Sequence, residues 1–195
     1  MSDLEFLDKS IRRVHDFPKP GILFYDITSV LVNPEAFKYV IDQMVSIYKD
    51  KKIDAVAGVE SRGFIFAAPF AEKLGIPLVL IRKKGKLPGD TYECSYSLEY
   101  GTATVEVHKA DIKKGQNILV VDDLIATGGS VIEVVNVLRE AGAEVLGIVS
   151  IFTYGMKKGI EKLKEAEVEN TSLTNFDAVI NVAAEIGYIR HEDIE

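Results

Sequence analysis

The chain has 195 residues, 47% of them hydrophobic, and its 30 acidic and 23 basic side chains give a net charge of −7 at pH 7. This length suits a single domain whose core needs no disulfide or metal, and the acidic balance argues against a general binder of nucleic acid or anionic membranes. One cysteine excludes an internal disulfide, no apolar run approaches the roughly 20 residues of a membrane span, and the charged N-terminus is unlike a secretory signal, so we expect a cytoplasmic globular protein.

The first half of the chain predicts an irregular segment, a helix, a strand, a second helix and a second strand. The irregular segment holds two prolines and a glycine, the helices show apolar residues at helical spacing, and the strands are short apolar runs. Asn33-Pro34 is a typical helix start, and Gly75 is a typical helix end. In chain order the five segments cover 17–28, 35–49, 53–59, 63–74 and 77–81.

The second half predicts a long loop, a half-exposed strand, a buried strand, a helix that Gly142 caps, another buried strand, a charged helix, an edge strand and a short helix. In the half-exposed strand, Val105 and Val107 alternate with Thr104 and Glu106, so the latter pair is expected to face solvent. The eight segments cover 82–101, 102–108, 118–121, 131–141, 145–152, 156–167, 177–182 and 183–187.

Strands that alternate with helices predict an α/β fold with an open, mostly parallel twisted sheet. Ligands bind such sheets beyond the carboxyl ends of the strands. Three segments of unusual composition fall at predicted strand ends, namely 60–63, 82–89 and 122–130. The sequence therefore predicts one binding site built from these three segments.

The segment 118–130 carries the strongest chemical signal. A buried apolar strand delivers Asp122 and Asp123 to the sheet edge, and a loop of small residues then leads into a helix. Backbone N–H groups and a helix N-terminus favour a phosphate monoester, and the two carboxylates suit the hydroxyl groups of a sugar. The alternative is an ordinary strand–turn–helix in which the acids cap the helix. The loop residues are Ala126, Thr127, Gly128, Gly129 and Ser130.

Two basic segments suit a diphosphate. Arg62 lies in a turn before a helix, where a guanidinium and backbone N–H groups can hold diphosphate oxygens. Residues 82–86 hold four bases and no acid, which creates a local positive field on an acidic chain. The alternatives are a surface arginine at a helix start, and a solvated basic loop or an RNA patch.

Two further segments could cover a bound substrate. Residues 95–101 end the predicted long loop and include Glu99 and Tyr100, although Tyr96, Leu98 and Tyr100 also alternate as on a strand face. The apolar half of the irregular segment, Ile22 to Tyr25, must pack against something. The three histidines share no spacing typical of a metal site.

These motifs resemble those of type I phosphoribosyltransferases. The strand, acid pair and loop at 118–130 resemble the signature that binds phosphoribosyl diphosphate (PRPP). Glu-Ser-Arg-Gly-Phe at 60–64 and Arg-Lys-Lys-Gly-Lys-Leu-Pro-Gly at 82–89 are similar to the adenine-specific branch. The resemblance implies that family's fold, a mostly parallel sheet flanked by helices with a small N-terminal hood and a flexible catalytic loop. It also implies one domain over 1–195, with a hood at 1–34, a core at 35–150 and a C-terminal extension at 151–195.

The resemblance implies a role for each candidate residue. Arg62 is expected to take part in catalysis, in PRPP binding and in base binding. PRPP would be bound by Arg62, Arg82, Lys83, Lys86, Asp122, Asp123 and the loop 126–130. Glu99 would handle a proton on the purine and Tyr100 would close the site, with Arg62 and Lys86 as further catalytic groups. The base would meet Ile22, Leu23, Phe24, Tyr25 and Arg62. Tyr25 departs from relatives, which commonly have a basic residue there.

The implied reaction is transfer of the 5-phosphoribosyl group from PRPP to adenine, giving AMP and diphosphate in purine salvage. Mg²⁺ would come with PRPP rather than be bound by the protein directly, and the implied assembly is a homodimer without nucleic-acid or membrane partners. The tail at 150–155, 172–177 and 187–189 resembles orotate phosphoribosyltransferases instead. The alternatives are therefore an enzyme for orotate or another base, and a PRPP-sensing regulator without catalysis.

Overall fold

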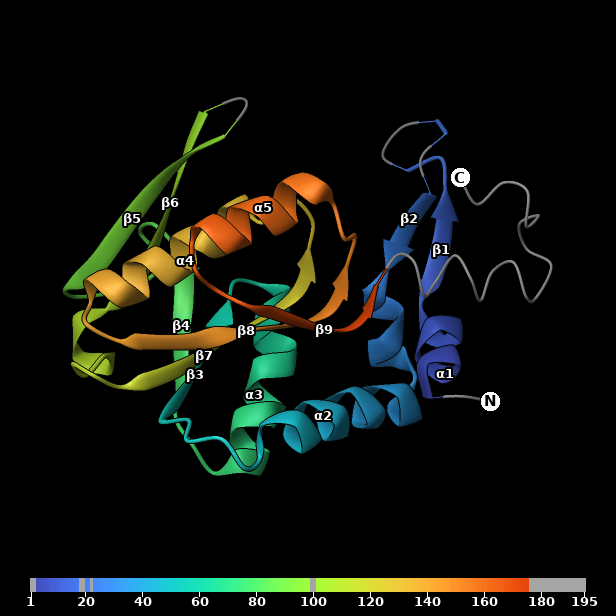
Figure 1. Ribbon diagram of the computed structural model, residues 1–195, viewed down its shortest axis with the longest axis horizontal. Helices are drawn as coiled ribbons and strands as arrows, with labels where there is room; N and C mark the ends of the chain where they lie inside the picture. Colours follow the sequence, from blue (N-terminus) through green and yellow to red (C-terminus); the bar gives the residue numbers. More distant parts are fainter. Residues whose placement is uncertain (1–2, 18–19, 22, 99–100, 176–195) are drawn as a thin grey trace.

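The computed structural model describes residues 3–17, 20–21, 23–98 and 101–175. Within these ranges a seven-stranded sheet forms the centre of the molecule (Figure 1). The strand order is β5-β6-β4-β3-β7-β8-β9, and the five strands from β4 to β9 run parallel. These five are β3 (Ala55–Val59), β4 (Leu78–Lys83), β7 (Asn117–Ile125), β8 (Glu144–Thr153) and β9 (Asn170–Asn175). The prediction of a mostly parallel sheet is confirmed.

Helices cover both faces of this sheet (Figure 1). α2 (Pro34–Tyr48) and α3 (Arg62–Leu74) lie on one face, and α4 (Gly129–Glu140) and α5 (Lys157–Glu165) lie on the other. The apolar run of β7 is buried on both faces, because Leu119 and Val121 join the core under α2 and α3, while Ile118 and Val120 join the core under α4. A strand with two buried faces reads as a continuous apolar run.

The expected helix limits are confirmed to within a few residues. Asn33 caps α2, since its side-chain oxygen accepts hydrogen bonds from the backbone N–H groups of Glu35 and Ala36. Gly75 ends α3 in the left-handed conformation.

The N-terminal segment contains regular structure that the sequence analysis missed. α1 (Asp3–Ser10) precedes two short antiparallel strands, β1 (Arg12–His15) and β2 (Leu23–Asp26), and a 3-10 helix η1 (Ile27–Val32) follows. The expectation of irregular backbone over 17–28 is therefore wrong for β2 and η1. These elements lie beside β9 at one end of the sheet (Figure 1).

The expected long loop at 82–101 is also wrong in most of its length. β4 continues to Lys83, and β5 (Thr91–Leu98) pairs antiparallel with β6 (Gly101–His108) as a hairpin. The hairpin forms because Tyr92 and Cys94 pack against the core under α4, where Val105 and Val107 of β6 are buried. Glu99 and Tyr100 lie outside the described residues.

Two strands differ from expectation near the site and the tail. β7 does not end at the acid pair but continues to Ile125, because Leu124 and Ile125 still pair with β8. The described edge strand is β9, whereas the edge strand expected at 177–182 and the helix expected at 183–187 lie outside the described residues. No helix of the described part of the chain is long and apolar enough to cross a membrane.

Cys94 offers a chemical test of the packing between β5 and α4. Burial, together with a hydrogen bond from its Sγ to Glu133 Oε2 (3.0 Å), raises the pKa of the Cys94 thiol to about 11. The thiolate is the reactive form, so at pH 8 we expect alkylation by iodoacetamide to be roughly 100- to 200-fold slower than for an ordinary thiol. Mass spectrometry of the single cysteine measures this rate. Glu133→Gln should speed the reaction, and a rate equal to that of free cysteine would contradict the packing.

Candidate active site

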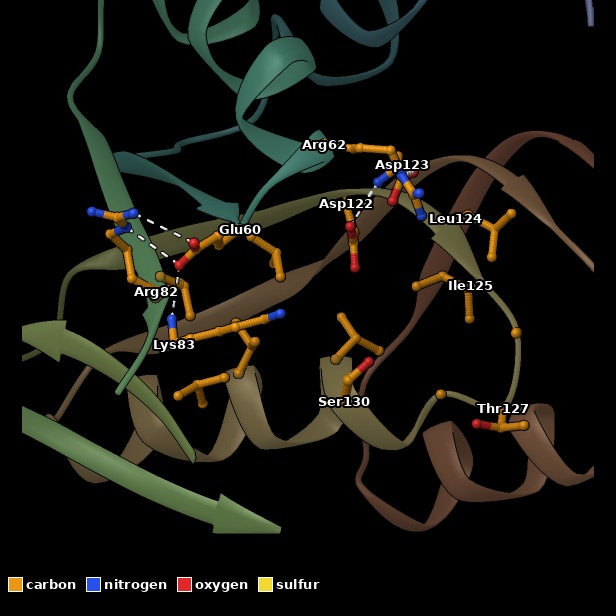
Figure 2. A pocket seen from close by; sticks show the side chains of 17 residues that line it. Glu60, Arg62, Arg82, Lys83, Asp122, Asp123, Leu124, Ile125, Thr127 and Ser130 are labelled. Carbon is orange, nitrogen blue, oxygen red and sulfur yellow. Dashed lines mark hydrogen bonds and ion pairs between the residues drawn. The ribbon is translucent and has the colours of Figure 1, made fainter. Parts of the chain in front are cut away.

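A cavity of about 360 Å³ opens at the carboxyl ends of β3, β4 and β7. Figure 2 shows its side chains converging from the three strand ends and from the start of α4. The three segments that the sequence singled out meet here, since residues of 60–63, 82–89 and 122–130 all line the cavity. Of the predicted PRPP residues, it brings together Arg62, Arg82, Lys83, Asp122, Asp123, Ala126, Thr127, Gly128 and Ser130. Gly129 and Lys86 are adjacent but do not line it.

The two carboxylates of β7 sit in different electrostatic surroundings. Asp123 is almost fully buried and forms an ion pair with Arg62 Nε. Asp122 Oδ1 accepts the backbone N–H of Asp123 (2.8 Å). Burial and the neighbouring charge of Asp123 hold the pKa of Asp122 well above its usual value. The pair therefore combines a charge-compensated carboxylate with one that is readily protonated.

The loop 126–128 connects β7 to α4, whose first turn faces the cavity. The first N–H groups of a helix have no partners within the helix, and the helix dipole adds positive potential there. The Ser130 side chain points into the cavity (Figure 2). This arrangement suits a phosphate dianion, as the sequence predicted.

The loop also rests directly on α5. A Cβ atom at Gly159 of α5 would lie 2.6 Å from the carbonyl oxygen of Ala126 and 3.4 Å from the backbone of Thr127. Only a glycine allows this approach. A helix of the C-terminal extension thus forms the support of the predicted phosphate loop.

Arg62 stands at the centre of the site. It opens α3, lines the main cavity, and also lines a smaller cavity of about 220 Å³ beside it. A Cβ at the next residue, Gly63, would lie 2.9 Å from the carbonyl oxygen of Val121, so α3 starts in close contact with β7. The peptide bond between Glu60 and Ser61 is cis.

The bases of the segment 82–86 divide into paired and unpaired groups. Arg82 donates to both carboxylate oxygens of Glu60 (3.3 and 3.4 Å) and to the carbonyl oxygen of Lys86 (3.2 Å). Lys84 pairs with Glu93 (2.7 Å). Within the described ranges, the ammonium groups of Lys83 and Lys86 have no ion pair. These two lysines are therefore available for an anionic ligand.

A separate pocket of about 270 Å³ lies under β2 and η1. Its lining includes Phe24, Tyr25, Leu124, Tyr154 and again Arg62. Tyr25 is buried and stacks on Phe152, with ring centroids 5.4 Å apart. Leu23 belongs to β2 but does not line this pocket, and Ile22 lies outside the described residues.

Three residues of the site region had been given no role in binding from the sequence. Glu60 accepts hydrogen bonds from Arg82 and from the backbone N–H of Lys83 (2.9 Å). Glu106 was expected to face solvent, but it is buried, with 3% of its surface exposed. Tyr154 closes the pocket under β2 from the end of β8. Glu106 could have been found as an acidic residue on the strand that pairs with the start of the basic segment. Nothing in the sequence pointed to Tyr154.

Comparison with known proteins identifies the family. The phosphoribosyl transferase domain matches residues 26–185. Adenine phosphoribosyltransferase of Treponema denticola is 64% identical over 147 residues, which cover 75% of this chain and 77% of that protein.

Solved structures of the same family superpose closely. The adenine phosphoribosyltransferase of Thermoanaerobacter pseudethanolicus has a TM-score of 0.82 and 40% identity, covering 89% of this chain and 99% of that one. The Saccharomyces cerevisiae enzyme, complexed with D-2,5-dideoxy-2,5-imino-altritol 1,6-bisphosphate and adenine, has a TM-score of 0.80 and 34% identity over 88% of this chain and 98% of its own. This chain therefore belongs to the adenine phosphoribosyltransferases.

Proposed function

We propose that the chain transfers the 5-phosphoribosyl group of PRPP to N9 of adenine and releases diphosphate, as a purine-salvage enzyme. The observation that carries this proposal is the meeting of three chemistries in one cavity: two carboxylates, a helix-start phosphate loop and a basic turn. A sugar with a phosphate monoester and a diphosphate needs all three. The similarity to a structure complexed with adenine supports the choice of base.

The 5-phosphate and ribose are assigned to the end of β7. The loop 126–130 would surround the phosphate with backbone N–H groups and the hydroxyl groups of Thr127 and Ser130. Asp122 and Asp123 would accept hydrogen bonds from the ribose hydroxyls. Positive charge develops on the ribose ring as its bond to the diphosphate loosens, and a nearby carboxylate stabilises that charge.

The diphosphate is assigned to Arg62, Lys83 and Lys86, with Arg82 holding the basic turn. Cationic donors that are fixed before the reaction stabilise the charge that the leaving diphosphate gains. Mg²⁺ would enter with the phosphates of PRPP rather than on carboxylates of the protein, since Asp123 is paired with Arg62 and the pKa of Asp122 is raised; when bound, it would neutralise part of the leaving-group charge. The described residues hold no cluster of three or more His, Cys, Asp or Glu side chains that would bind a metal alone.

The base is assigned to the pocket under β2. Phe24, Tyr25, Leu124 and Tyr154 supply apolar and aromatic walls for a planar purine, and Arg62 joins this pocket to the main cavity. Backbone groups around Ile22 and Leu23 would read the edge of adenine. Glu99 would handle the purine proton, and Tyr100 would close the site and exclude water that otherwise hydrolyses PRPP. We further propose a cytoplasmic homodimer.

A base-dependence assay tests the function. Purified protein, PRPP and Mg²⁺ are mixed separately with adenine, hypoxanthine, guanine and orotate, and diphosphate release is followed. Release with adenine alone is the expected result. Release with orotate instead would show that the C-terminal resemblance to orotate phosphoribosyltransferases indicates the substrate. Tight PRPP binding without diphosphate release for any base would favour a regulator without catalysis.

A further inference from the structure

The buried carboxylate of Glu106 lies directly beneath the basic turn. Glu106 lies near the end of β6, opposite Arg82 of β4 on one side and Glu93 of β5 on the other. Its Oε1 atom accepts hydrogen bonds from the backbone N–H groups of Lys86 (2.8 Å) and Leu87 (2.7 Å). One carboxylate oxygen therefore fixes two consecutive peptide groups of the turn.

The other end of the turn is held in the same way. Glu60 accepts the backbone N–H of Lys83 (2.9 Å), and Arg82 links Glu60 to the carbonyl oxygen of Lys86. These contacts use peptide groups and the Arg82 side chain, but neither of the ammonium groups of Lys83 and Lys86. The turn is thus fixed at both ends while its two free cations remain available.

Electrostatics also favours an acid at this position. Four bases within 82–86 repel one another, and negative charge close to the backbone of the turn reduces this repulsion. Burial opposes ionisation of Glu106, but the backbone N–H groups of Leu87, Gly85 and Lys86 outweigh it, so the pKa of Glu106 lies below its usual value. The carboxylate is therefore charged at neutral pH.

We propose that Glu106 is a positioning residue for the diphosphate of PRPP: by anchoring the peptide groups of Lys86 and Leu87, it orders the basic turn before the substrate binds. This rests on the proposed function, which assigns the turn to the diphosphate. Pre-ordered donors bind more tightly because no conformational entropy is lost on binding. AMP carries the same 5-phosphate and base but no diphosphate, so its affinity is independent of the turn.

The test compares the binding of PRPP with Mg²⁺ and the binding of AMP by calorimetry. Glu106→Ala is expected to weaken PRPP about tenfold, as for loss of hydrogen bonds to a charged acceptor, and to leave AMP within about twofold. Glu106→Gln keeps an oxygen that accepts both N–H groups, so it should restore most of the PRPP affinity. The matched control is Glu93→Ala, since Glu93 lies opposite Glu106 across the sheet but is 38% exposed, against 3% for Glu106, and among the described residues its carboxylate pairs with Lys84 rather than with the backbone of the turn.

Several outcomes would overturn the proposal. These are PRPP affinity unchanged in Glu106→Ala, equal weakening of PRPP and AMP, and Glu106→Gln as weak as Glu106→Ala. If the alanine variant does not fold, Glu106→Asp carries the test, because it keeps the charge but withdraws the oxygen by one methylene, and it should also weaken PRPP alone. Wild-type protein that binds AMP but not PRPP would instead reject the proposed function.

Discussion

Replacing Arg62 with Ala is expected to lower kcat/KM for PRPP by about 10²- to 10³-fold, the usual effect of removing one fixed donor from a charged transition state. Arg62 is the residue that the main cavity, the smaller cavity beside it and the pocket under β2 share. Its loss removes a cation from the diphosphate side and leaves the buried carboxylate of Asp123 without its ion-pair partner. Steady-state kinetics with varied PRPP measures the effect.

The stability of this variant separates a catalytic from a structural role. About half of the Arg62 side chain is exposed, at 53%, but the Asp123 side chain is only 7% exposed, so Arg62→Ala leaves a buried carboxylate without compensation. Loss of such a partner costs more than the roughly 0–1 kcal/mol of an exposed ion pair, so we expect a lower Tm beside the large loss of activity. Arg62→Lys keeps the charge beside Asp123 but loses the planar fork, so it should recover most of the Tm while its activity falls between those of the wild type and Arg62→Ala.

A matched control for Arg62 comes from the N-terminal segment. Arg12 pairs with Asp26 and has a similar exposure of 57%, but it lines none of the cavities described above. Arg12→Ala should keep nearly full activity. An Arg62→Ala variant that retains more than a tenth of wild-type kcat/KM would remove Arg62 from the catalytic groups.

The sequence predicted which segments meet at the candidate site better than it predicted the residues that hold these segments in place. Segments 60–63, 82–89 and 122–130 are far apart in the chain, yet the rule that ligands bind at the carboxyl ends of parallel strands places them together. The three segments meet because β3, β4 and β7 are neighbouring parallel strands, and their apolar runs are visible in the sequence without knowledge of their neighbours. Phosphate loops carry their chemistry in local backbone, which the sequence also specifies.

The missed features depend on contacts between distant residues. β5 is polar and lacks an apolar run, so its pairing with β6 decides its structure rather than its own propensity. The alternation of polar and apolar residues in β6 predicted that Glu106 faces away from the core, where solvent would cover an isolated strand. In the protein the turn at 83–87 covers that side instead. Tyr154 lines the pocket under β2 only because β8 ends beside β2, which brings the C-terminal extension next to the N-terminal segment.

Replacing Gly159 with Ala gives the sharpest test of whether the C-terminal extension takes part in substrate binding. In a lone helix this change is favourable by about 1 kcal/mol, because alanine is the better helix former. In this protein the new Cβ would meet the carbonyl oxygen of Ala126 at 2.6 Å, and a backbone atom cannot turn away as a side chain can. Overpacking of this kind costs about 1–3 kcal/mol. We therefore expect a net loss of stability, opposite in sign to the helix propensity, measured as a lower Tm.

The binding pattern of Gly159→Ala should differ from that of Glu106→Ala. Displacement of α5 would disturb the loop 126–130. Under the proposed function both PRPP and AMP place their 5-phosphate in that loop, so both affinities should fall together by about tenfold or more, which corresponds to roughly 1.4 kcal/mol. Lys158→Ala, at the exposed neighbouring position of α5, should change neither affinity nor Tm. A Gly159→Ala protein with raised Tm and unchanged AMP binding would show that α5 does not support the phosphate loop. The expected result would instead make α5, a helix of the C-terminal extension, a working part of the proposed PRPP site.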